Sequence, residues 1–152
     1  MRTIADILVV DASDEDAAGT LDSLRTATPG STLFRLTDGR EAFHFIYATA
    51  GFAGRPTGLP RLVLLEMYLP SMSGIAVLES LRARPSMRPL PVVMWTSASN
   101  PLLIEQALQA GASAYHLKPA ALDDYHAAMD MIVQQWLPRA TAPSTVVSQK
   151  SA

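Results

Sequence analysis

Five short apolar runs punctuate the chain, and a turn or an amphipathic segment follows each of them. They lie at residues 4–10, 32–36, 62–65, 91–95 and 114–117. Apolar residues that follow one another without alternation are typical of strands buried on both faces of a parallel sheet. The most informative run belongs to the stretch LVLLEMYLPSMSG, residues 62–74, in which four apolar residues end at a carboxylate, Glu66.

Between these runs, apolar residues recur at helical spacing, which predicts amphipathic helices. Four of the helices start after a residue type that caps helix N-termini, namely Ser13, Asp38, Ser73 and Asn100. A last helix is expected from about residue 122 to 136, before Pro138. In the first helix, the residues expected to face the sheet are Ala17, Ala18, Leu21 and Leu24.

Five strands that alternate with five helices predict an α/β fold. The expected architecture is a doubly wound parallel sheet with right-handed crossovers, forming one three-layer domain. We expect this domain to cover residues 4–137. Residues 138–152 are rich in Ser, Thr and Ala without a period, so we expect a disordered tail there and no output domain after it.

Composition narrows the class of protein. With 49% hydrophobic and 17% charged residues in 152 positions, the chain is expected to bury a core. The net charge of −2 gives no reason to expect nucleic acid or an anionic membrane as a partner. Without cysteine, disulfides and thiolate metal sites are excluded. No signal peptide or membrane-spanning run stands out, so we expect a cytoplasmic protein.

Polar side chains follow several of the predicted strands. In a parallel sheet the carboxyl ends of the strands share one edge, where ligands bind. The residues delivered there are Asp11, Glu66, Thr96, Ser97 and Lys118. Taken alone, Glu66 would simply mark the exit of its strand into solvent. Lys118 changes this interpretation, because the chain has only one other lysine, Lys150, and two carboxylates, hydroxyls and an ammonium at one edge favour a site.

A family resemblance rests on five segments that follow one another along the chain: ILVVDAS, TDGREAF, LVLLEMYLPSMSG, PVVMWTS and GASAYHLKP. Over residues 4–137 the chain resembles a response-regulator receiver domain of two-component signalling. The resemblance implies a flavodoxin-like sheet with the strand order 2-1-3-4-5. The longer connection before the third strand is similar to that of single-domain receivers paired with phytochrome-type kinases.

The resemblance also implies roles for the residues at the sheet edge. In the family, a carboxylate after the third strand accepts a phosphoryl group from a kinase histidine, and Glu66 stands at that position. The residual Mg²⁺ site would comprise Asp11, Glu66 and Tyr68. Thr96 and Lys118 match the groups that bind phosphoryl oxygens. Metal and ammonium neutralise the charge of the transferring oxygens in such a reaction.

Two further positions match the family pattern, and two depart from it. Tyr115 falls where the family has a switch aromatic, and Pro119 is a candidate for a cis peptide bond. The second acid after the first strand is replaced by Ala12, and the acceptor is glutamate instead of aspartate. Losing a ligand weakens Mg²⁺ binding, and an added methylene displaces the carboxylate by about 1 Å, which can slow a positioned reaction about 10²-fold. Asp14 lies nearby, but we assign it to the first turn of the helix.

These features predict an atypical receiver that is not an enzyme, with little or no phosphorylation and no cofactor beyond weakly bound Mg²⁺. Its partner would be a histidine kinase or a downstream protein. The expected contact face is residues 101–135, including for a homodimer. Glu66 paired with Lys118 would mimic the phosphorylated state or lock one state; a decayed site on a scaffold is the alternative.

Two other functions stay open at this stage. The first is conventional phosphotransfer, with the chain as a phosphorylatable response regulator. The second, more distant, is a small flavodoxin-like ligand-binding protein or enzyme. Against the second, the sequence contains no Walker loop, no G-x-G-x-x-G motif and no nucleophile elbow.

Overall fold

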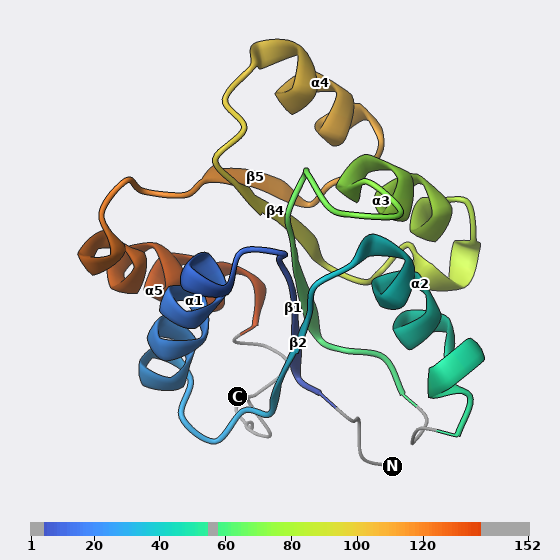
Figure 1. Cartoon of the computed structure of the whole chain (residues 1–152), viewed down its shortest axis with the longest axis horizontal. Helices are drawn as coiled ribbons and strands as arrows, with labels where there is room; N and C mark the ends of the chain where they lie inside the picture. Colours follow the sequence, from blue (N-terminus) through green and yellow to red (C-terminus); the bar gives the residue numbers. More distant parts are fainter. Residues whose placement is uncertain (1–4, 55–57, 138–152) are drawn as a thin grey trace, which may run out of the picture.

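The computed structural model describes residues 5–54 and 58–137 (Figure 1). One parallel sheet is formed by β1 (Ile7–Val10), β2 (Leu33–Leu36), β3 (Leu62–Leu65), β4 (Val92–Thr96) and β5 (Ala114–Leu117). The strands lie in the order β2-β1-β3-β4-β5, as the resemblance implied. The predicted doubly wound, flavodoxin-like architecture is therefore confirmed.

Helices cover both faces of the sheet (Figure 1). They are α1 (Asp14–Ala27), α2 (Gly39–Tyr47), α3 (Gly74–Arg82), α4 (Pro101–Gln109) and α5 (Tyr125–Trp136). Three short 3-10 turns accompany them: η1 (Ala50–Phe52), η2 (Pro85–Met87) and η3 (Leu122–Asp124). One core packs α2, α3 and α4 against the sheet, and a second core packs α1 and α5 against the opposite face.

The three central strands are buried along their whole length, but the two edge strands are not. Every residue of β1, β3 and β4 is buried, whereas β2 and β5 are only partly covered. An edge strand has a neighbour on one side only, so less of its surface is removed from water. The prediction of five buried strands thus holds for the centre of the sheet alone.

All four predicted helix caps form in the structure. The side chains of Ser13, Asp38, Ser73 and Asn100 each accept a hydrogen bond from a backbone amide in the first turn of their helix. Such caps satisfy amides that have no partner within the helix. The helix starts are therefore fixed by local sequence, and with them the strand-to-helix turns that surround the carboxyl edge of the sheet.

The buried face of α1 differs from the predicted apolar stripe. Ala18 is exposed, and Thr20 is fully buried instead. The Thr20 hydroxyl donates to the carbonyl of Asp16 (2.9 Å) and accepts from Nε1 of buried Trp95 (2.8 Å). A satisfied hydroxyl can be buried, so the face of α1 is set by a polar contact that hydrophobic periodicity does not register.

Two sequence-based expectations concern the ends of the chain and membranes. The tail predicted at residues 138–152 lies outside the described residues. Within the described ranges, no helix is long and apolar enough to cross a membrane.

Gly74, the first residue of α3, packs directly beneath the strand end that carries Glu66. A Cβ at this position would lie 2.2 Å from the backbone oxygen of Glu66. We therefore expect Gly74→Ala to lower the free energy of unfolding by about 1–3 kcal/mol through overpacking. Urea denaturation measures this. Gly51→Ala is the matched control, because a Cβ there meets nothing within 4 Å; equal effects of the two substitutions would contradict the prediction.

Candidate functional site

The side chain of Lys118 is the centre of a charged cluster at the carboxyl edge of the sheet. Lys118 directly follows β5 and its side chain is only 3% exposed. Its Nζ donates to Asp11 Oδ2 (2.7 Å), Glu66 Oε1 (2.7 Å) and Asp16 Oδ2 (2.9 Å). Asp11 follows β1, Glu66 follows β3 and Asp16 lies in the first turn of α1. One ammonium thus joins two strand ends and a helix.

Glu66 reaches a second group with its other oxygen. Its Oε2 accepts hydrogen bonds from the amide of Met67 (2.7 Å) and from the hydroxyl of Thr96. The carboxylate therefore lies between Lys118 and Thr96, with one oxygen on each. These are the two residues that the sequence predicted to bind phosphoryl oxygens.

A chain of hydrogen bonds continues from Thr96 to the predicted switch aromatic. The Thr96 hydroxyl accepts from the amide of Ala98 (3.1 Å), and the hydroxyl of Tyr115 donates to the carbonyl of the same Ala98 (2.6 Å). The segment between β4 and α4 is thereby held on both sides. Tyr115 is connected to Glu66 through two intervening residues.

The charges of the cluster are mutually dependent. Burial alone would lower the pKa of the Lys118 ammonium, but its hydrogen bonds to three carboxylates outweigh burial and raise that pKa above its usual value. Burial raises the pKa of the Asp11 carboxyl, although hydrogen bonds from Lys118 and from the Ser13 amide act in the opposite direction. Burial and the negative charge of Glu66 raise the pKa of the Tyr115 hydroxyl. Lys118 consequently stays charged throughout the physiological range.

The structure brings Asp16 into the site, which was not predicted from the sequence. Asp14, the acid considered as a substitute for the missing ligand, is turned outward; its side chain is 93% exposed and pairs with Arg35 at 2.9 Å. Asp16 stands two positions further along the helix and reaches Lys118 instead. The signal available in the sequence was an acid in the first helical turn after a strand exit, a position that the helix dipole also favours for acids.

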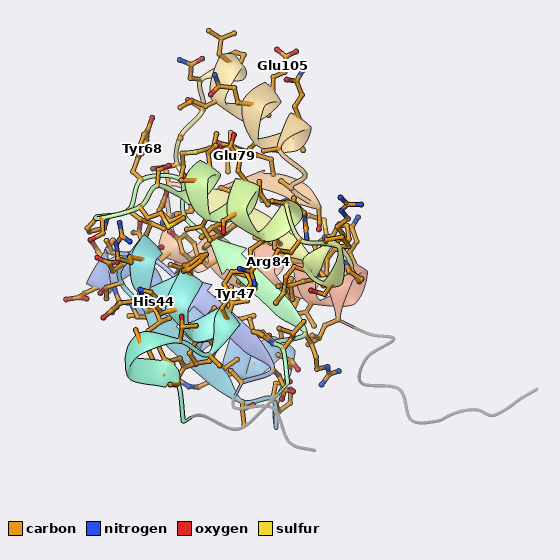
Figure 2. All side chains as sticks on the ribbon, turned by 90° about the vertical axis from the view of Figure 1, so that its right-hand side faces the viewer. His44, Tyr47, Tyr68, Glu79, Arg84 and Glu105 are labelled. Atoms are coloured by element: carbon orange, nitrogen blue, oxygen red, sulfur yellow. The ribbon has the colours of Figure 1, made fainter. Side chains whose placement is uncertain are left out.

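Two predicted site residues, Tyr68 and Pro119, differ from what was expected of them. The side chain of Tyr68 is exposed and projects from the molecule, so that only its amide approaches Glu66, at 3.4 Å (Figure 2). No peptide bond in the described ranges is cis, and the bond before Pro119 is therefore trans. Proline permits the cis form without requiring it, since trans is still favoured by about 0.5–1 kcal/mol.

The donors of the cluster do not fit a divalent cation as they stand. Among the described residues, no group of three or more His, Cys, Asp or Glu side chains is arranged to hold a metal ion. Mg²⁺ requires several oxygen ligands in octahedral geometry at about 2.0–2.1 Å. Here the carboxylates converge on an ammonium, and Ala12 supplies no side-chain oxygen.

Comparison with known proteins agrees with the fold. A family model described as the response regulator receiver domain matches residues 7–130. Response regulator Rcp1 from Synechocystis is 28% identical over 138 residues, which are 91% of this chain and 92% of Rcp1. The phosphorylated cyanobacterial phytochrome response regulator RcpA superposes with a TM-score of 0.83 at 25% identity, covering 93% of this chain and all of RcpA. The Mn²⁺-bound form of Rcp1 has a TM-score of 0.81 at 28% identity, over 92% of this chain and 99% of Rcp1.

Thr96→Val tests whether the hydroxyl holds the site together. The substitution keeps the shape of the buried side chain but leaves the Ala98 amide without its acceptor and removes one donor from Glu66. We expect the free energy of unfolding to fall by about 1–3 kcal/mol. Urea denaturation measures the change. Thr26→Val is the control, because that hydroxyl is exposed on α1, and the prediction fails if the two substitutions cost the same.

Proposed function

The chain belongs to the response regulator receiver family, and from this premise we propose that it is an atypical receiver whose site is held by Glu66 without a phosphoryl group. Receivers are signalling regulators that work with histidine kinases. The observation that carries the proposal is the position of one carboxylate, which contacts Lys118 with Oε1 and Thr96 with Oε2. Those two residues match the family's phosphoryl-binding positions, so the glutamate occupies contacts that a phosphoryl group would make.

The same contacts disfavour Glu66 as an acceptor. A nucleophilic oxygen must be aligned with the incoming phosphorus, whereas the hydrogen bonds to Glu66 hold its carboxylate between Lys118 and Thr96, where the phosphoryl oxygens would have to bind. The cationic help for such a transfer is also reduced, because Ala12 replaces one acid of the metal site. We therefore assign the chain little phosphorylation and weak Mg²⁺ binding at most.

The bonded state of Tyr115 supports a fixed output. In the receiver family, the aromatic residue at this position couples the site to the partner surface. Here its hydroxyl is hydrogen-bonded to Ala98, which Thr96 also contacts. We propose that Glu66 keeps this connection formed, so that the protein presents one conformation to its partner. A scaffold with a decayed site would not need the continuous hydrogen bonds from Glu66 to Tyr115.

We place the partner surface on residues 101–135. Six large hydrophobic residues in the described ranges are exposed, and only Tyr68 lies outside this segment; the others are Leu102, Leu108, Leu117, Leu122 and Met131. They lie on α4, β5, η3 and α5, and exposed apolar groups are typical of protein contacts. A second copy of the chain and a histidine kinase are the partners proposed. RcpA is a phytochrome response regulator, which favours a phytochrome-type kinase.

Conventional phosphotransfer is the second candidate. It is favoured by the similarity to RcpA, which was solved in phosphorylated form, and to Rcp1, which was solved with Mn²⁺. Both proteins match nearly the whole chain. In this alternative, Glu66 would have to leave Lys118 and Thr96 before it accepts a phosphoryl group.

Incubation with a small acyl-phosphate donor and Mg²⁺, followed by intact-mass analysis, separates the two candidates. We expect no phosphoryl adduct on the wild type, because the acceptor oxygens are engaged and one metal ligand is missing. The matched control is Ala12→Asp/Glu66→Asp, which restores both family positions and is expected to form an adduct. A stoichiometric adduct on the wild type would establish phosphotransfer instead.

A charge on the proposed contact face tests the surface. Leu102 is 67% exposed on α4, and Leu102→Glu places a carboxylate on this face. We expect the dimer dissociation constant to rise at least tenfold, about 1.4 kcal/mol, in analytical ultracentrifugation. Ala18→Glu adds the same charge to the exposed side of α1 and should leave the constant unchanged. A monomeric wild type, or equal effects of both variants, would remove the homodimer from the proposal.

A further inference from the structure

We infer that Lys118 is the resident cation of this pocket, with Asp16 as its third carboxylate partner, so that the site assembles without a divalent metal ion. By resident cation we mean the positive charge that holds the carboxylates together in the folded protein. The inference rests on the proposed function, because it assigns a cation to the atypical site. It goes further in naming Asp16 and in predicting what excludes the metal.

The first argument is the saturation of the ammonium. A lysine ammonium has three N–H donors and no acceptor. All three are matched by carboxylate oxygens at 2.7, 2.7 and 2.9 Å, from Asp11, Glu66 and Asp16. The side chain is 3% exposed, so water contributes little to its solvation. The ammonium therefore depends on the carboxylates, and the carboxylates depend on it.

The second argument is the engagement of the oxygens that a metal would need. Asp11 offers Oδ2 to Lys118, and its Oδ1 accepts from the amide of Ser13 at 2.9 Å. Glu66 has Oε1 on Lys118 and Oε2 on the Met67 amide and the Thr96 hydroxyl. These oxygens keep further lone pairs, but a divalent ion placed on them would lie beside the buried ammonium and repel it. Pushing the ammonium out would leave a buried charge without its partners, which is strongly destabilising.

The third argument concerns the choice of Asp16. An acid at position 12 would have followed Asp11 at the strand end, but Ala12 is exposed and carries no charge. Asp16 comes instead from the first turn of α1, whose cap is Ser13. Its side chain is 33% exposed, and it reaches the ammonium from the solvent side. Asp16 thus supplies the third negative charge from a helix, and it serves the lysine.

The charges of the cluster predict how Mn²⁺ affinity changes when Lys118 is removed. The ammonium of Lys118 repels a second cation from the three carboxylates around it, and its removal creates an anionic pocket with three carboxylate donors. Hard cations such as Mn²⁺ prefer this kind of ligand set. Without Lys118, Mn²⁺ should bind more tightly than it does to the wild type.

The test is a Mn²⁺ titration of the full chain, with free Mn²⁺ followed by electron paramagnetic resonance. We expect one Mn²⁺ site in Lys118→Met, with an affinity at least about tenfold higher than that of any binding to the wild type. Lys150→Met removes the only other lysine and is the matched control for charge; it should behave as the wild type. Saturable binding to the wild type with the affinity of Lys118→Met would overturn the inference.

Folding of the variant is followed by circular dichroism in the same titration. If Lys118→Met is unfolded without metal, Mn²⁺ is expected to restore its helical signal, because a ligand that binds only the folded state stabilises it. A variant that neither binds Mn²⁺ nor refolds with it contradicts the inference.

The role of Asp16 is tested in the same background. Asp16→Asn/Lys118→Met should lose most of the gained Mn²⁺ affinity, whereas Asp14→Asn/Lys118→Met should retain it, because Asp14 faces solvent and pairs with Arg35. Equal affinities of the two double variants would remove Asp16 from the cluster. The metal titration and the acyl-phosphate assay fail separately: an adduct on the wild type refutes the proposed function, and Mn²⁺ binding to the wild type as tight as that to Lys118→Met refutes the resident cation.

Discussion

The ion cluster around Lys118 is the contact on which the geometry of the carboxyl edge depends. Two of its three acids, Asp11 and Glu66, are buried, and a buried carboxylate without a partner is strongly destabilising. The ammonium supplies that partner to both and adds Asp16 from α1. In this way it fixes β1, β3 and α1 relative to β5. In the sheet β5 pairs with β4, but this side chain ties the end of β5 to the ends of β1 and β3.

Glu66 extends the influence of the cluster beyond the charges. Aspartate would have to satisfy Lys118 and Thr96 with a shorter side chain, whereas the added methylene lets glutamate reach both at once. Through the Thr96 hydroxyl, the carboxylate is connected with Ala98 and Tyr115. In the proposed function, the carbon atom that distinguishes glutamate from aspartate displaces the acceptor oxygens and also lets the carboxylate bridge Lys118 and Thr96.

Local signals predicted much of this structure, and non-local contacts account for what was missed. The four helix caps and the central strands followed from residue types and short apolar runs, whose physics acts over a few residues. The site members Asp11, Glu66, Thr96 and Lys118 could be named because parallel strands share an edge. Asp16 could not, because its role depends on how far a lysine from β5 extends across the sheet. The burial of Thr20 was not predicted for a related reason. Its partner Trp95 lies 75 positions away, and a hydroxyl does not contribute to an apolar pattern.

The sequence separation within the ion cluster has a consequence for the order of folding. Lys118 lies 107 positions after Asp11, 102 after Asp16 and 52 after Glu66. A chain made from its N-terminus exposes these three acids long before their common partner has been synthesised. Until then the carboxylates are more stable in water than buried, so the segments that carry them stay exposed to solvent. The residue that follows the last strand therefore supplies the charge that allows this edge of the sheet to be buried from water. The site is among the final parts of the nascent protein to fold.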